Sequence, residues 1–139
     1  MEQDHAAEAV GRQLGAAGAI LVCGGLGGIM AAACRGAGAE AGMTVGFLPG
    51  TDRSSANDWV GVALPTGLGE LRNGLVVRAA DAVIAIGGGH GTLSEIALAL
   101  KAGVPVIGLD TWDVEGIQHV SSPGEAVARA LRAAGRSGS

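Results

Sequence analysis

The chain has 139 residues, of which 48% are hydrophobic and 16% are charged, and its formal net charge is −4. This length predicts one domain over residues 1–139 with one hydrophobic core. The basic residues are scattered, which argues against a nucleic-acid surface, and no apolar run approaches the roughly 20 residues needed to cross a bilayer. We therefore expect a soluble cytoplasmic protein with no nucleic-acid or membrane partner.

Helical and strand patterns alternate along the chain. Taken from the N-terminus, the expected elements are a helix from about residue 6 that Gly18 ends, a strand at 20–23, a helix at 29–41, a strand at 43–48, an edge strand near 60–64, a helix at 68–80, a strand at 82–86, a helix at 93–102, a strand at 104–109 and a helix from Pro123 to about residue 134. The tail at 135–139 is expected to be disordered. This alternation predicts an α/β, Rossmann-like three-layer fold with a mostly parallel sheet.

A glycine-rich turn follows the expected strand at 82–86 and leads into a helix. It contains Gly88, Gly89, His90, Gly91 and Thr92. The first N–H groups of a helix have no partner within it, and the helix dipole is positive at that end, so an anion is stabilised there. Glycines let a phosphate approach the backbone. The turn therefore predicts a phosphate site, although a tight turn without a ligand is the alternative.

A second glycine-rich loop follows the strand at 20–23 and contains Gly24, Gly25, Gly27 and Gly28. It is a second candidate for ligand binding, or a place where a strand and a helix pack closely. Neither loop completes the G-x-G-x-x-G fingerprint, and no acidic residue ends the strand at 43–48. A classical dinucleotide site is therefore not favoured, and the absence of Gly-Lys-Ser/Thr excludes a Walker A loop.

Two charged residues lie near these loops in the expected fold. Thr92 and Glu95 form the pattern T-x-x-E, which is typical of a capping box at a helix start, while the alternative is that Glu95 lines the ligand site. Arg72 lies on the helix at 68–80, where an arginine usually faces solvent. Cys23 and Cys34 are too few for a disulfide framework or a zinc site, so we expect reduced core thiols and no metal.

Three segments together resemble the LOG-like proteins, a Rossmann-type nucleotide-binding family that includes cytokinin riboside 5′-monophosphate phosphoribohydrolases. They are residues 22–30, the pair Arg72 and Asn73, and residues 80–95. The family signature P-G-G-x-G-T-x-x-E falls on residues 87–95 with Gly87 in place of proline. The family's Arg-Lys pair falls on Arg72 and Asn73, so asparagine stands in place of the lysine. The resemblance implies that the chain forms homodimers or larger homo-oligomers.

The resemblance also implies a function. Arg72 and Glu95 would be catalytic, Asn73 and the two glycine loops would bind the ligand, and a nucleoside 5′-monophosphate would lose its base without any cofactor. The glycine at 87 and the asparagine at 73 resemble instead a branch similar to the molybdenum-cofactor carrier proteins, which bind a phosphorylated pterin without hydrolysis. A non-catalytic carrier or sensor is therefore the alternative function.

Two further expectations follow from this resemblance. Many family members were once labelled lysine decarboxylases, and a pyridoxal phosphate enzyme of that kind needs a lysine for its Schiff base. The only lysine is Lys101, which is expected at the far end of a helix from the phosphate turn. We therefore expect that the chain is not a lysine decarboxylase. In addition, the family opens with a central strand, and no apolar run precedes Ala6. We expect a gap between the strands at 20–23 and 82–86. Either these strands pair directly, another subunit fills the gap, or the chain is a shortened form of a longer protein, which is the hypothesis we prefer.

Overall fold

The computed structural model describes residues 2–135 and has an α/β fold. The described elements are α1 (Glu2–Ala16), β1 (Leu21–Cys23), α2 (Ile29–Ala39), β2 (Thr44–Leu48), β3 (Val62–Pro65), α3 (Arg72–Ala79), β4 (Val83–Gly87), α4 (His90–Ala102), β5 (Val106–Thr111), β6 (Gln118–Val120) and α5 (Pro123–Ala133). Short 3₁₀ turns at Arg53–Ser55 and Gly69–Leu71 complete the set. Within residues 2–135, no helix is both long and apolar enough to span a membrane.

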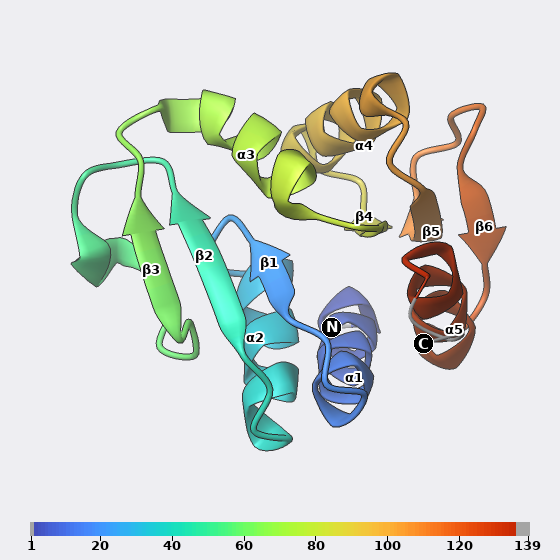
Figure 1. The fold of residues 1–139 in the computed structure, drawn as a ribbon, viewed down its shortest axis with the longest axis horizontal. Helices are drawn as coiled ribbons and strands as arrows, with labels where there is room; N and C mark the ends of the chain where they lie inside the picture. The colour runs from blue at the N-terminus through green and yellow to red at the C-terminus, as the bar shows by residue number, and fades with distance from the viewer. Residues whose placement is uncertain (1, 136–139) are drawn as a thin grey trace.

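The strands of the described residues form two separate three-stranded sheets, in the orders β1-β2-β3 and β4-β5-β6, and each of their pairings is parallel. The helices α1, α2 and α5 pack on one face of the strands, and α3 and α4 pack on the other, as Figure 1 shows. This is the three-layer Rossmann-like arrangement that the alternating pattern predicts. Between residues 2 and 135, β1 and β4 do not pair with each other, so the expected gap is present and direct pairing of the two strands is wrong.

The hydrophobic core lies mainly around α1 and the second sheet. Ala7 and Val10 of α1 pack with Ile86 of β4, Leu109 of β5 and Val127 of α5. A second cluster fills the space between α3, α4 and the same sheet, around Val77, Ile96 and Val106. The side chains are small, so the layers approach closely and the backbone comes near neighbouring elements.

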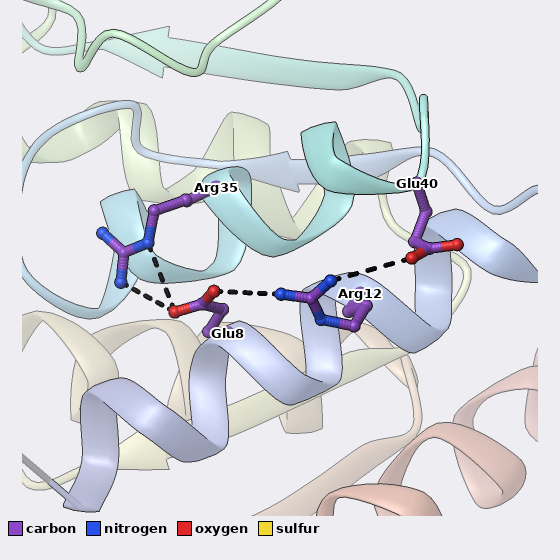
Figure 2. Close-up of polar contacts among 4 residues, drawn as sticks. All are labelled: Glu8, Arg12, Arg35 and Glu40. Atoms are coloured by element: carbon purple, nitrogen blue, oxygen red, sulfur yellow. Dashed lines mark hydrogen bonds and ion pairs between the residues drawn. The ribbon is translucent and has the colours of Figure 1, made fainter.

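The helices α1 and α2 approach so closely that glycine is required at their contact. A β-carbon at Gly11 would overlap the carbonyl oxygen of Ala33, and one at Gly36 would overlap the carbonyl oxygen of Glu8. Polar side chains border this contact, as Figure 2 shows: both Arg12 and Arg35 donate to the Glu8 carboxylate. The hydrogen bond from Arg35 is the main reason why the pKa of Glu8 lies below its ordinary value.

Several element boundaries differ from the sequence expectations. The first helix begins at Glu2 instead of near residue 6, so residues 2–5 form no strand. The helix expected at 68–80 is a 3₁₀ turn followed by α3 at Arg72–Ala79, and the short strand β6 was not expected. Pro123 begins α5 as predicted, with the Ser122 hydroxyl accepting from the Glu125 N–H. Apart from Gly135, the predicted tail lies outside the described residues.

Candidate functional site

The glycine turn after β4 leads directly into the N-terminus of α4. The helix begins at His90 with Gly89 as its N-cap, and its first backbone hydrogen bond runs from the Leu93 N–H to the Gly89 carbonyl at 3.1 Å. The N–H groups of His90, Gly91 and Thr92 therefore have no partner within the helix. A β-carbon at Gly88, Gly89 or Gly91 would meet no other atom within 4 Å. The glycines of this candidate anion site thus border open space, and its role in phosphate binding stays a prediction.

The expected capping box at Thr92 and Glu95 is wrong. Because α4 starts at His90, Thr92 lies inside the first turn and cannot be the N-cap, and the Gly89 N-cap makes no side-chain capping bond. The T-x-x-E pattern misplaced the helix start by three residues because the preceding Gly-His-Gly looked like turn residues. Because Glu95 is not part of a capping box, the alternative that it lines the ligand site is the one to consider.

The second glycine loop also leads into a helix N-terminus. Gly28 is the N-cap of α2 with φ 65°, and Gly25 has φ +78°, a left-handed conformation that favours glycine. A β-carbon at Gly87 would stand 2.8 Å from Cδ1 of Ile29, the first residue of α2. The two glycine loops are thus neighbours at the carboxyl ends of β1 and β4, as expected for a ligand site in a parallel α/β fold.

Arg72 lies on the first turn of α3 and is buried, with only 8% of its surface exposed, instead of facing solvent. Its Nε donates to the Phe47 carbonyl at 2.9 Å, and its Nη1 donates to Oδ1 of Asn73. A β-carbon at Gly24 would stand 2.7 Å from its Nη2. The structure thus places Arg72, Asn73 and the first glycine loop side by side.

Glu95 is half-buried on the second turn of α4, and its carboxylate lies in the electrostatic range of Arg72. Burial raises the pKa of Glu95 above its ordinary value, and the positive charge of Arg72 opposes part of that rise. A carboxyl group in this setting can hold a proton closer to neutrality than an exposed one. The candidate site therefore contains one fixed cation and one group with a raised pKa.

The two thiols lie beneath the first loop. Cys23 ends β1, and its Sγ is 3.6 Å from the Sγ of Cys34 on α2; both thiols are free. The hydrogen bond with Cys34 and burial raise the pKa of Cys23 well above its usual range. Cys23 is therefore a poor nucleophile at neutral pH. The same hydrogen bond lowers the pKa of Cys34, which is buried on α2.

Three residues that sequence reasoning missed hold the two loops in place. Trp112 donates from Nε1 to the Gly89 carbonyl at 3.0 Å, and its ring stacks with His90 at 6.1 Å between centroids. The Thr111 hydroxyl donates to the Gly87 carbonyl, and the Asn57 side chain donates to the Leu26 carbonyl. The position of Trp112 just after a predicted strand was the available signal, because the carboxyl ends of parallel strands share one edge.

One cavity of about 560 Å³ reaches both glycine loops, Arg72 and Glu95. Of the predicted site residues, it is lined by Gly24, Gly27, Arg72, Asn73, Gly89, Gly91, Thr92 and Glu95. Gly25, Gly28, Gly88 and His90 do not line it. Lys101 lies in the last turn of α4, at the opposite end of the helix from the glycine turn. In the described part of the chain, no group of three His, Cys, Asp or Glu side chains is arranged to hold a metal ion.

Comparison with known proteins gives matches over nearly the whole chain. The model of the SLOG cluster4 family matches residues 1–134. An uncharacterized protein of Archaeoglobus fulgidus is 41% identical over 119 residues, which are 85% of this chain and 78% of that protein.

Two solved structures are similar in fold and sequence. One is the molybdenum cofactor binding protein of Rippkaea orientalis, with a TM-score of 0.87 and 36% identity over 94% of this chain and 86% of that one. The other is the molybdenum cofactor carrier protein of Chlamydomonas reinhardtii, with a TM-score of 0.87 and 33% identity over 95% of this chain and 88% of that one.

Proposed function

We propose that this chain, which belongs to the SLOG cluster4 family, is a non-catalytic carrier of a phosphorylated small molecule, and that its cargo is the molybdenum cofactor. The observation that carries the proposal is the similarity, at 36% and 33% identity over at least 94% of the chain, to two proteins that bind or carry this cofactor. The molybdenum cofactor contains a phosphorylated pterin, so it has an anionic group that suits a helix N-terminus.

The phosphate of the cargo would bind to the N–H groups of His90, Gly91 and Thr92. The open space over Gly88, Gly89 and Gly91 supports this placement, because no side chain separates the backbone from an incoming anion. The N-terminus of α2, after Gly28, supplies a second set of free N–H groups beside the first. The rest of the ligand would extend into the cavity toward Gly24, Gly27 and Arg72.

Asn73 supports the carrier over a hydrolase. In the hydrolytic LOG-like proteins that the sequence resembles, a lysine stands beside the arginine. Here the neutral Asn73 accepts a hydrogen bond from Arg72, whose Nε is already engaged by the Phe47 carbonyl. The arginine is thus held in the wall of the site by two acceptors, and the second positive charge of the Arg-Lys pair is missing.

A phosphoribohydrolase remains the second candidate because of Glu95. A half-buried carboxyl group with a raised pKa, close to an arginine in a cavity, is suited to proton transfer or to stabilising positive charge on a ribose ring. In this alternative the nucleoside 5′-monophosphate would place its phosphate at the same turn. The two candidates share the anion site and differ in whether a bond is broken.

One experiment with two measurements separates the candidates. The protein is mixed anaerobically with molybdenum cofactor freshly released from a molybdoenzyme and passed through a gel-filtration column. The pterin that elutes with the protein is then oxidised and quantified by fluorescence. In parallel, the protein is incubated with AMP, GMP, CMP and UMP, and free base and ribose 5-phosphate are measured by chromatography.

We expect close to one pterin per site and no release of base. A Gly89→Val variant should elute without pterin, which links retention to the glycine turn. Release of base that Glu95→Gln abolishes would establish the hydrolase instead. Failure of the wild-type protein to retain pterin would reject the carrier function.

A further inference from the structure

The two cysteine side chains meet although they come from different elements. Cys23 is the last residue of β1, Cys34 lies on α2, and their sulfur atoms are 3.6 Å apart. Figure 1 shows β1 and α2 side by side, with the first glycine loop, residues 24–28, connecting them. Because the S–S bond of a disulfide is about 2.0 Å long, the two sulfurs lie within about 1.6 Å of bonding distance.

The sulfur pair is hydrogen-bonded to the loop between the two cysteines. The Gly25 N–H donates to Sγ of Cys23 at 3.3 Å. The backbone N–H of Asn57 donates to the Gly25 carbonyl at 2.9 Å, and its side chain donates to the Leu26 carbonyl at 2.8 Å. The same side chain also hydrogen-bonds to Cys34. A change at either sulfur therefore reaches the loop through direct contacts.

The two thiols differ in how they can be reached. Cys34 has no exposed surface, whereas Cys23 is half-buried and lines the cavity of the candidate site. A reagent that enters this cavity meets Cys23 first, and the Cys34 sulfur lies in contact with that of Cys23. An accessible thiol beside a second, protected thiol is the arrangement of an attacking cysteine and a resolving cysteine.

The two thiols also share their protons. The hydrogen bond with Cys34 and burial raise the pKa of Cys23, while the hydrogen bonds with Cys23 and Asn57 lower the pKa of Cys34. The two groups therefore lose their protons as one unit, the first easily and the second with difficulty. Cys23 carries the negative charge only when the remaining proton lies on Cys34. Its reaction with a reagent in the cavity is therefore slow near neutral pH and faster at higher pH.

We propose that Cys23 and Cys34 form a reversible disulfide by exchange with a small disulfide that enters the cavity. In the first step the Cys23 thiolate attacks one sulfur of the small disulfide, a mixed disulfide forms, and a small thiolate leaves. In the second step the Cys34 thiolate attacks Sγ of Cys23, the bond between the two residues forms, and the other small thiolate leaves. The cysteine pair loses two electrons to the small disulfide, and the thiol protons of the pair go to the leaving thiolates.

The disulfide changes the first glycine loop because the elements on either side of the loop are fixed. The strand β1 is paired with β2 along its whole length, from Leu21 to Cys23. The helix α2 is held by its close contact with α1, where Gly11 and Gly36 leave no space for a β-carbon. The approach of the two sulfurs is therefore taken up mainly by residues 24–28, which the new bond encloses in a ring with the N-terminus of α2.

This change reaches the candidate site. Gly24 lies against the guanidinium group of Arg72, and both residues line the cavity. The oxidation state of the cysteine pair thus sets the shape of one wall of the site. Only the identity of the ligand that senses this wall rests on the proposed function. The disulfide and its effect on the loop do not, so the experiment measures both without any cargo.

The test uses the full chain and 2-hydroxyethyl disulfide as the oxidant. The reduced, desalted protein is incubated with the oxidant near neutral pH and at about pH 8.5, the ordinary pKa of a cysteine thiol. Intact mass spectrometry after alkylation of the denatured protein counts the free thiols, and non-reducing electrophoresis detects linked dimers. Acid quenching at early times, followed by fragmentation of the peptide that contains both cysteines, identifies the residue that is modified first. Amide NMR spectra are recorded for the reduced and the oxidised protein.

We expect the wild type to lose both free thiols without forming linked dimers, and to lose them faster at the higher pH. Before alkylation its mass should fall by about 2 Da, the mass of two hydrogen atoms, and a phosphine reductant should reverse the change. The first modified residue should be Cys23. The amides of residues 24–28 should shift on oxidation, whereas that of Gly103, at the far end of α4, should not. A Cys34→Ser variant should stop at the mixed disulfide.

Four results would overturn the proposal. They are retention of both thiols by the wild type at both pH values, disulfides that form only between chains, first modification at Cys34, and a disulfide that leaves the amides of residues 24–28 unshifted. The early-quench measurement uses the wild type, so it decides the order of attack even if Cys34→Ser does not fold. Failure of the protein to retain pterin would reject the carrier function and would leave each of these measurements decisive for the disulfide.

Discussion

The guanidinium group of Arg72 lies against the backbone of Gly24, so that a β-carbon at residue 24 would stand 2.7 Å from Nη2 and 2.9 Å from Sδ of Met30. This glycine is required by the space that Arg72 occupies and not by an unusual backbone conformation. The contact joins the first glycine loop to the buried arginine, and it makes the position of each dependent on the other.

Replacement of Gly24 by alanine should therefore displace Arg72 from the Phe47 carbonyl. We expect a loss of about 1–3 kcal/mol in the free energy of unfolding, which is typical of an added methyl group in a filled space. Urea unfolding followed by circular dichroism measures this loss. The matched control is Gly27→Ala in the same loop, where a β-carbon meets nothing within 4 Å and the change should stay within about 0.5 kcal/mol. Equal effects of the two variants would contradict the contact.

Replacement of Gly89 by valine should abolish binding of the phosphorylated ligand while the fold is retained. The side chain would enter open space, so the stability should change by less than about 1 kcal/mol, but it would cover the N–H groups of α4. Titration calorimetry with AMP and with inorganic phosphate measures the effect. Gly50→Val, at another glycine with open space around its β-carbon, should leave binding unchanged. Unaltered AMP affinity in a folded Gly89→Val protein would place the anion elsewhere.

Glu95 should make the stability of the protein depend on pH. Because its folded pKa is raised by burial, the folded state holds this proton more tightly than the unfolded state. The contribution of Glu95 is therefore least favourable above the folded pKa, and the destabilisation disappears as the pH falls below about 4.3. Glu95→Gln should be more stable than the wild type at pH 8, and the difference should close toward pH 4. Urea unfolding at both pH values checks the sign, with the exposed Glu70→Gln as the control.

The contact between α1 and α2 gives a stability prediction far from the site. Gly11→Ala places a methyl group where the Ala33 carbonyl oxygen lies and should cost about 1–3 kcal/mol. Gly38→Ala on the exposed face of α2 meets nothing within 4 Å and should instead stabilise the helix by about 0.5–1 kcal/mol. Thermal unfolding of both variants would show opposite shifts in Tm. A similar shift in Tm for both variants would mean that α1 and α2 can move apart without a loss of stability.

The sequence predicts the layered fold well because short apolar runs and small-residue helices alternate along it. All five expected strands are found within two residues of their predicted ends. The strand β6 was missed because Gln118–Val120 has neither an apolar run nor an alternating pattern. Its pairing with β5 is a long-range contact that local sequence does not encode.

The candidate site was harder to predict in detail. The sequence predicts the two glycine loops because glycines that directly follow a strand let a ligand approach the backbone. The burial of Arg72 could not be predicted from the pattern of α3, since its partner, the Phe47 carbonyl, is 25 residues away along the chain. The role of Trp112 depends in the same way on a loop that only the assembled second sheet brings near Gly89.

The division into two sheets also affects the order in which the chain can fold. The first sheet is made only from residues 21–65 and the second only from residues 83–120, so each can assemble from one half of the chain. Of the described elements, α1 is synthesised first, and it contacts β4 and α5 as well as α2. During synthesis it can pack on α2 early, but β4 and α5 are made later. Docking of the second half against α1 is therefore the expected late step, in which the most distant parts of the chain meet.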